Sequence, residues 1–258
     1  MAKKTGPQTG LFPGIAGKRA LVTGASSGLG AHFVRLLADQ GALVTAAARR
    51  ADKLATVCSD IAKAGGQVTP LEMDVSDAAS VQQALHGTAF DIVINNAGTA
   101  LSASALDHDA DAIDRIIDTN LKGAFHVARH TAPTMKDKGT GGAIVNIGSI
   151  ASERVAGHMA AYTASKAGLL QLTRALALEW ARYGIRVNCL NPGYIETDIN
   201  RDFFQTDAGQ ALIKRIPQRR LGQPQDLDGP LLLLVSDLSV FMTGSDIAVD
   251  GGHLVSSL

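Results

Sequence analysis

The sequence predicts an α/β fold in which a doubly wound parallel sheet lies between two layers of helices, in a three-layer α/β/α arrangement. Apolar runs of strand length alternate with longer amphipathic runs along the 258 residues. The strand runs are apolar at most positions, as expected for strands that are covered on both faces of a sheet. No linker, repeat or low-complexity stretch interrupts this alternation, so we expect a single domain over residues 18–258.

The elements are assigned in chain order from these runs. Strands are expected at 19–24, 42–48, 68–73, 91–96, 143–149, 186–192 and 246–251, and helices near 29–40, 51–64, 77–87, 110–137, 160–183 and 225–237. Residues 1–17 mix Gly, Pro, Lys and Thr and are expected to form a loose N-terminal extension. Residues 194–224 fit the alternation least well, so we expect them to form a substrate loop or lid, with an apolar pocket shaped by Tyr194, Phe203 and Phe204.

Composition excludes several classes of partner. The chain has 24 Lys and Arg against 24 Asp and Glu, which leaves no basic surface for nucleic acid or for an anionic membrane. The longest purely apolar run, 231–235, is too short to span a bilayer, and the first ten residues lack a secretory signal. Two cysteines, Cys58 and Cys189, cannot build a disulfide framework, and no Cys/His cluster has the spacing of metal ligands. We therefore expect a cytoplasmic protein that binds no metal.

A glycine-rich turn follows the first expected strand. The stretch "LVTGASSGLG" at 21–30 contains Gly24, Gly28 and Gly30. Glycines at a strand-to-helix turn let the backbone approach a pyrophosphate, which then lies at the N-terminus of the helix. The spacing differs from the G-x-G-x-x-G of the dinucleotide fingerprint, and an ordinary glycine-rich loop is the alternative. Its position nevertheless predicts a Rossmann-like dinucleotide site.

The end of the second expected strand indicates which dinucleotide is bound. Ala48 is followed by Arg49 and Arg50, and no carboxylate occurs before Asp52. An acid at this turn would bind the ribose 2′-hydroxyl of NAD, whereas an arginine suits the 2′-phosphate of NADP. We therefore expect NADP, with Arg49 at the phosphate. NAD stays open as an alternative because arginine pairs are common on protein surfaces.

Tyr162 and Lys166 lie four residues apart in an expected helix, so they share one helix face. An ammonium close to a phenol favours phenolate and lowers the phenol pKa from its usual value of ~10. Ser149 ends the fifth expected strand, where its hydroxyl can donate a hydrogen bond to a substrate oxygen. The three residues predict a proton-transfer site, and the alternative is an incidental Tyr and Lys on a solvated helix face.

These stretches make the sequence similar to the short-chain dehydrogenase/reductase family from about residue 17 to 252. The resemblance is carried by "TGASSGLG" 23–30, "NNAG" 95–98, Asn120 in "TNLKG", Ser149 in "NIGSI", "YTASK" 162–166, "NPG" 191–193 and "VDGG" 249–252. It implies that Tyr162 is the general acid/base, Lys166 its cationic neighbour and Ser149 the hydroxyl that polarises the substrate carbonyl. Asn120 would hold a water in a proton relay.

The resemblance also implies the cofactor contacts. The adenine would meet Asp74 and Val75, and Asn96 would lie beside the adenosine half. The nicotinamide carboxamide would meet Ile195 and Thr197. The residues at the pyrophosphate would be Gly24, Ser26, Ser27, Gly28, Leu29 and Gly30. Lys166 would also bind the ribose, beside Tyr162.

The expected function is an NADP-dependent oxidoreductase that interconverts a small-molecule ketone and a secondary alcohol by hydride transfer. A 3-oxoacyl thioester reductase and a diol or sterol dehydrogenase are alternatives of the same chemistry. A non-catalytic dinucleotide-binding sensor or scaffold belongs to another class, which the presence of Tyr162, Lys166, Ser149 and Asn120 disfavours. Apolar residues on more than one side of segments 110–137 and 160–183 predict a second buried surface, and the resemblance implies a homotetramer, with a dimer as the alternative.

Overall fold

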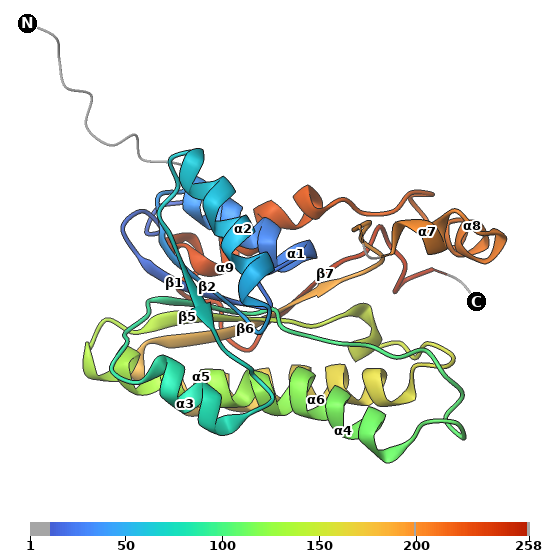
Figure 1. The fold of residues 1–258 in the computed structure, drawn as a ribbon, viewed down its shortest axis with the longest axis horizontal. Helices are drawn as coiled ribbons and strands as arrows, with labels where there is room; N and C mark the ends of the chain where they lie inside the picture. Colours follow the sequence, from blue (N-terminus) through green and yellow to red (C-terminus); the bar gives the residue numbers. More distant parts are fainter. Residues whose placement is uncertain (1–10, 199, 257–258) are drawn as a thin grey trace, which may run out of the picture.

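The computed structural model describes residues 11–198 and 200–256, and these residues form a sheet between two layers of helices (Figure 1). The strands are β1 (Arg19–Thr23), β2 (Leu43–Ala48), β3 (Val68–Glu72), β4 (Ile92–Asn95), β5 (Gly142–Ile147), β6 (Ile185–Pro192) and β7 (Asp246–Val249). They lie in the order β3-β2-β1-β4-β5-β6-β7, and neighbouring strands are parallel. The predicted doubly wound parallel sheet is confirmed.

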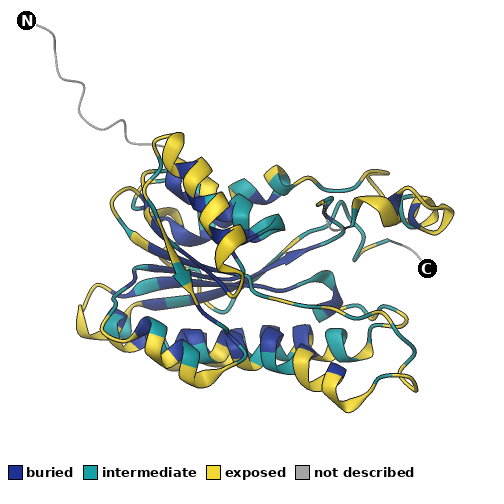
Figure 2. Ribbon diagram, in the orientation of Figure 1, coloured by how far each residue is buried: buried dark blue, intermediate teal, exposed yellow. Residues whose placement is uncertain are grey.

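Helices cover both faces of the sheet (Figure 1). One face carries α1 (Gly28–Asp39), α2 (Ala51–Lys63) and α9 (Asp228–Val235), and the other carries α3 (Ala78–Leu85), α4 (Ala110–Ile117), α5 (Gly123–Asp137) and α6 (Ala160–Trp180). Each helix turns its apolar stripe towards the strands, so two separate cores form. Phe33 and Leu231 belong to the first core, and Met135 and Leu176 to the second. The strands between them are largely buried (Figure 2).

The single helix predicted over 110–137 is interrupted. A π-helical turn at Asp118–Lys122 separates α4 from α5 and carries Asn120. Hydrogen bonds from the Asn120 side chain to Thr99 and Ser165 hold this wider turn in place, and π turns are frequent at functional sites.

Two further segments differ from a simple helix or loop. The helix predicted at 225–237 consists of a 3₁₀ turn at Pro224–Leu227, then α9, then a 3₁₀ turn at Asp237–Ser239. The expected substrate loop, 194–224, contains the short helices α7 (Arg201–Phe204) and α8 (Asp207–Ile213), and residue 199 in it lies outside the described residues.

Residues 11–17 are packed against the domain, in contrast to the loose extension predicted for 1–17. Ile15 is fully buried, the Pro13 carbonyl accepts a hydrogen bond from Asp237 N at 3.0 Å, and Gly17 N donates to Gly41 O at 2.8 Å. Burial of the apolar Ile15 side chain accounts for the difference. Residues 1–10 lie outside the described residues.

The strand order places a crevice at one edge of the sheet. The chain winds from β1 towards β3 in one direction and from β4 towards β7 in the other, so the connections after β1 and β4 diverge. Ligands of open α/β sheets bind outside the carboxyl ends of the strands at such a reversal. Within the described ranges, no helix has the length and apolar character needed to cross a bilayer.

Candidate functional site

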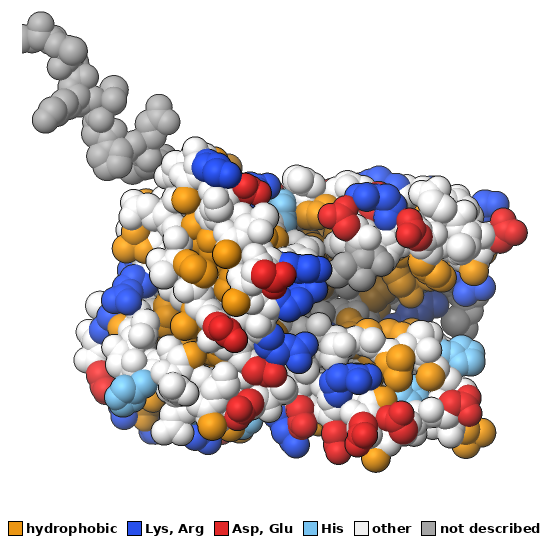
Figure 3. Space-filling model, in the orientation of Figure 1, with side chains coloured by type: hydrophobic (Ala, Val, Ile, Leu, Met, Phe, Trp, Pro, Cys, Tyr) orange, Lys and Arg blue, Asp and Glu red, His pale blue; other side chains and the backbone are white. Residues whose placement is uncertain are grey.

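A cavity of about 600 Å³ lies at the carboxyl ends of the central strands. The surface is hollowed between the segment that carries α7 and α8 and the layer of α4 and α6 (Figure 3). The residues predicted for the site that line this cavity are Gly24, Ser26, Ser27, Gly28, Leu29, Gly30, Arg49, Asp74, Val75, Asn96, Ser149, Tyr162, Lys166, Ile195 and Thr197. The fold therefore brings together residues that are up to 173 positions apart, from Gly24 to Thr197.

The proposed proton-transfer residues lie where β5 meets α6. Ser149 follows β5, and its Oγ accepts a hydrogen bond from Ala151 N at 3.1 Å, which leaves its own proton free to be donated. Tyr162 and Lys166 lie in the first turns of α6. The Lys166 ammonium donates to the Ile147 carbonyl at 2.7 Å and lies 5.8 Å from the centroid of the Tyr162 ring. The shared helix face predicted from the spacing is present.

The protonation of this pair differs from the prediction. Burial raises the pKa of Tyr162, and a hydrogen bond with the Ser149 side chain lowers it by a smaller amount. Burial also lowers the pKa of Lys166 to about 8. We expected the ammonium to lower the phenol pKa, but in this structure desolvation of the phenol outweighs the other effects. The ammonium is instead engaged by the Ile147 carbonyl.

Asn120 lies behind the cavity wall. Its Oδ1 accepts a hydrogen bond from Thr99 N at 2.8 Å, and its Nδ2 donates to Thr99 O at 2.9 Å and to Ser165 Oγ at 3.0 Å. Ser165 Oγ in turn donates to the Tyr162 carbonyl at 2.7 Å. The side chain of Asn120, only 1% exposed, therefore braces the loop after β4 against the helix that carries Tyr162.

The glycine-rich turn has the form that a pyrophosphate requires. Gly24 has φ +67°, and a Cβ there would lie 2.8 Å from Ala97 Cα. A Cβ on Gly30 would strike the Gly24 carbonyl. The helix α1 begins at Gly28 and has no side-chain cap at Ser27, so its first amide N–H groups are available to an anion. These residues therefore fit the diphosphate of a dinucleotide.

The adenosine end contains a residue that sequence reasoning missed. Arg50, rather than Arg49, reaches the glycine-rich turn, and its Nη2 donates to Ser26 Oγ and Ser27 Oγ at 3.0 Å each. Arg49 Nη1 instead lies 3.6 Å from Asp74 Oδ2. Both arginines line the cavity. The sequence showed that two arginines follow β2. It could not show which of them reaches the glycine-rich turn, because the directions of the two side chains depend on the turn after β2.

Asp74 is held ionised beside these arginines. Burial by itself would raise the pKa of Asp74, but hydrogen bonds from Ser76 and the charge of Arg49 lower it. Ser76 donates to Asp74 Oδ1 through its N–H at 2.9 Å and through its hydroxyl at 2.6 Å. The site thus presents one fixed carboxylate and two guanidinium groups to the adenosine half of a dinucleotide.

The start of the 194–224 segment lines the opposite end of the cavity. Ile195 forms a bridge with Gly222, and Asn200 accepts from Thr197 N and donates to Ile195 O, each at 2.8 Å. Tyr194 lines the cavity, with the Phe204 ring 6.1 Å from its own. Phe203, also predicted to shape an apolar pocket, is 48% exposed and contacts Phe204. Among the described residues, no group of three or more His, Cys, Asp or Glu side chains could hold a metal ion.

Comparisons with known proteins agree with this arrangement. A family model described as "Enoyl-(Acyl carrier protein) reductase" matches residues 24–253. The L-rhamnose 1-dehydrogenase (NAD(P)(+)) of Azotobacter vinelandii is 36% identical, over 93% of this chain and 97% of its own length. The D-erythrulose reductase of Gallus gallus is also 36% identical, over 93% of this chain and 97% of its own length.

A solved structure shows the same fold. The gluconate 5-dehydrogenase of Burkholderia cenocepacia, crystallised in complex with NADP and tartrate, superimposes with a TM-score of 0.89 at 35% identity and covers 94% of this chain and 97% of its own. The matched family model, the curated relatives and the shared fold together show that this chain belongs to the short-chain dehydrogenase/reductase family of oxidoreductases.

Proposed function

We propose that the protein is an NADP-dependent oxidoreductase that interconverts a ketone and a secondary alcohol by hydride transfer. One observation carries this proposal: Ser149, Tyr162 and Lys166 face the same cavity as the glycine-rich turn. A cavity with only the turn would suit a dinucleotide sensor, whereas a hydroxyl and a phenol at its other end supply proton chemistry. This combination favours an enzyme.

The residues of the chain divide the work between binding and proton transfer. A bound nicotinamide dinucleotide would donate or accept the hydride. Ser149 donates a hydrogen bond to the substrate oxygen, and Tyr162 donates the proton in reduction or accepts it in oxidation. Lys166, whose ammonium lies beside the same cavity, would hold the ribose. Asn120 keeps the helix that carries Tyr162 against the loop after β4.

Cofactor binding divides among the turns at the strand ends. The turn at 24–30 and the N-terminus of α1 would hold the pyrophosphate, Asp74 and Val75 the adenine, and Ile195 with Thr197 the carboxamide. The phosphate that distinguishes NADP from NAD would lie against Arg49 and Arg50, where Ala48 replaces the acid that suits NAD. The NADP complex of the solved relative supports this assignment.

We propose a small polyhydroxylated substrate, a sugar or a polyol. The relatives act on L-rhamnose and D-erythrulose, according to their names. Thr99, Ser149 and Tyr194, which carry hydroxyl groups, line the cavity, and hydroxyl-rich substrates require such partners. A screen of aldoses, ketoses, polyols, simple ketones and 3-oxoacyl thioesters with NADPH, NADH and their oxidised forms tests this class. Preference for a thioester would overturn it.

Replacement of Tyr162 tests the site itself. Tyr162→Phe keeps the ring but removes the proton donor, so turnover should fall by ~10²–10⁴-fold. The affinity for NADPH should change little, because the phenol is not a main anchor of the cofactor. The matched control is Tyr183→Phe, since Tyr183 lies outside the cavity, against Lys136. Near wild-type turnover in Tyr162→Phe on a good substrate would show that the site is wrong.

A further inference from the structure

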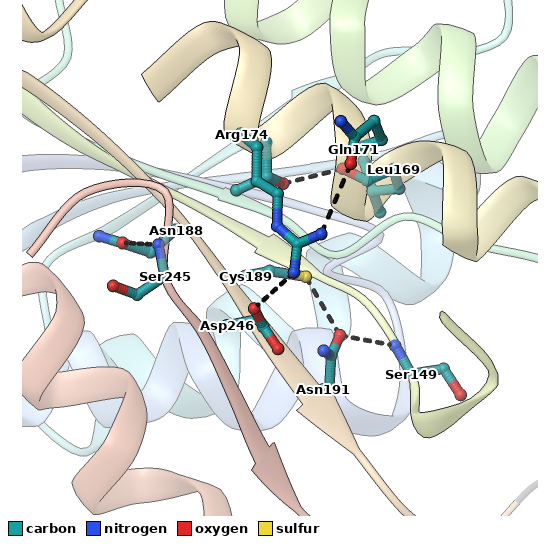
Figure 4. A network of polar contacts seen from close by, with 10 residues as sticks. Ser149, Leu169, Gln171, Arg174, Asn188, Cys189, Asn191, Ser245 and Asp246 are labelled. Carbon is teal, nitrogen blue, oxygen red and sulfur yellow. Dashed lines mark hydrogen bonds and ion pairs between the residues drawn. The ribbon is translucent and has the colours of Figure 1, made fainter. Parts of the chain in front are cut away.

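The side chain of Asn191 contacts the residue proposed to polarise the substrate. Asn191 lies on β6 and is fully buried. Its Oδ1 accepts hydrogen bonds from Ser149 N at 3.2 Å and from Cys189 Sγ at 3.1 Å (Figure 4). Burial raises the pKa of Cys189 to about 12, so its sulfur keeps the proton that it donates. Both neighbours are donors, and the amide oxygen must therefore face them.

The absence of a side chain at Gly148 leaves room for the amide of Asn191. A Cβ on residue 148 would lie 2.7 Å from Cys189 Sγ and would overlap the Asn191 amide oxygen. Only a glycine lets the Asn191 side chain pass so close to the backbone that leads into Ser149. The contact is therefore built into both segments.

Ile147, Gly148 and Ser149 at the end of β5 each form a hydrogen bond with a different residue. Lys166 donates to the Ile147 carbonyl at 2.7 Å, and Gly148 N donates to Leu190 O at 2.8 Å. The ladder between β5 and β6 ends at the pair Ile147 and Leu190. Ser149 lies beyond that ladder, so the Asn191 side chain supplies the acceptor for its N–H.

Packing alone does not explain an asparagine at position 191. Its Nδ2 is buried and has no hydrogen-bond acceptor among residues 11–198 and 200–256. A buried donor without a partner destabilises the folded state, and an apolar side chain of similar size would avoid that cost. The feature that an apolar residue lacks is the amide oxygen, which faces Ser149.

We propose that Asn191 is a positioning residue that fixes Ser149 within reach of the substrate oxygen and the Tyr162 phenol, with Cys189 orienting the amide. This inference rests on the proposed role of Ser149. Without the amide oxygen, the Ser149 backbone is free to move, and a small misplacement of a catalytic group slows turnover strongly.

The test compares Asn191→Ala and the near-isosteric Asn191→Leu with wild type, each alone and combined with Ser149→Ala. In both single variants kcat should fall by ~10–100-fold, whereas the Kd for NADPH, measured by fluorescence titration, should stay within about twofold. In the Ser149→Ala background, either substitution should cost less than about twofold, because residues that act as a unit are non-additive.

A pH profile supplies a second readout. The Ser149 hydrogen bond lowers the pKa of Tyr162, so displacing Ser149 should raise it. The basic limb of alcohol oxidation should therefore move to higher pH in Asn191→Ala, as in Ser149→Ala. The other titratable groups that face the phenol are Lys166 and Tyr194, and Cys189 acts on Lys166. These variants retain all three groups.

The matched control is Asn188→Ala, another buried asparagine on β6. Its amide donates to Met242 O at 2.9 Å and accepts from Ser245 N at 3.0 Å, so it does not reach Ser149. This variant should lose thermal stability, whereas the basic limb of its pH profile for alcohol oxidation should stay at the wild-type pH. Equal losses of kcat for the Asn191 variants with and without Ser149 would overturn the inference. Full activity in Ser149→Ala would instead overturn the proposed function.

Discussion

At the scale of single residues, burial decides which proton state Tyr162 favours. Burial raises the pKa of the phenol, so it is protonated at neutral pH. A protonated phenol is the form that donates to a developing alkoxide, whereas alcohol oxidation needs the phenolate. The site, before a cofactor adds its own charge, is therefore poised for reduction.

Lys166 gives this site a pH dependence of its own. Burial lowers its pKa to about 8, so its ammonium is lost as the pH rises through that value. If the ammonium binds the ribose, the Kd for NADPH should increase above about pH 8 in the wild type, and titrations across this range measure it. The dependence should disappear in Lys166→Met and persist in the control Lys63→Met, because Lys63 lies on the exposed side of α2. A wild-type Kd that stays flat past pH 8 would contradict a role in binding.

At the scale of elements, the turns after β1 and β2 together form the adenosine end of the cavity. The hydroxyls of Ser26 and Ser27 in the first turn bind Arg50 of the second. Arg49 is 62% exposed and faces the carboxylate of Asp74, with which it forms an ion pair. Arg50 is therefore already directed at the position where the two turns meet.

This arrangement predicts how the cofactor preference is encoded. Arg50→Leu should weaken NADPH by ~10-fold or more, the size of one lost charge-assisted hydrogen bond, and should leave NADH nearly unchanged. Arg49→Leu should have a smaller effect, because Asp74 already partly neutralises its charge. Ala48→Asp with Arg49→Leu should shift preference towards NADH, since it adds the acid that binds a 2′-hydroxyl. Fluorescence titrations with both cofactors measure each change.

The ratio of the affinities for NADPH and NADH distinguishes a loss of cofactor specificity from damage to the glycine-rich turn. Equal weakening of NADPH and NADH by Arg50→Leu would show that Arg50 only supports the glycine-rich turn. Better kcat/KM of the wild type with NADH than with NADPH would overturn the NADP assignment itself.

At the scale of the whole molecule, apolar side chains remain exposed on two surfaces. Leu178 of α6 is 84% exposed, and Phe125 of α5 is 42% exposed. Next to β7, Val240 is 69% exposed and Phe241 is fully exposed. Exposed apolar side chains that are neighbours, such as Val240 and Phe241, mark protein interfaces, whereas single ones are common on any surface. Two such surfaces would suit a closed assembly with two kinds of twofold contact.

We therefore predict a homotetramer, with a dimer as the alternative. Light scattering at micromolar concentration should give four times the chain mass of 26.8 kDa. Phe241→Asp and Leu178→Asp should each reduce the mass to that of a dimer, because each would place a charge in one contact. Leu106→Asp, at a leucine 96% exposed in the loop before α4, serves as the control. A monomer mass for the wild type would contradict the prediction.

The features that depend on neighbours along the chain could be predicted from the sequence alone. Apolar runs located the strands to within one or two residues, because burial on both faces requires them. The dinucleotide site was predicted from the glycines of the turn at 24–30. The shared helix face of Tyr162 and Lys166 was predicted from their spacing of four residues. The glycine-rich turn and the residues Ser149, Tyr162 and Lys166 line one cavity, which confirms that they meet at one end of the sheet.

The contacts of the side chains at this end of the sheet could not be predicted from the sequence and are known from the folded structure. The choice of Arg50 over Arg49, the π turn around Asn120 and the contact of Asn191 with Ser149 depend on groups that are distant in sequence; the last pair is 42 residues apart. The raised pKa of Tyr162 likewise depends on how much water the folded chain removes from the phenol. Hydrogen-bond direction and desolvation are set by packing across the sheet, and no local pattern of residues encodes them.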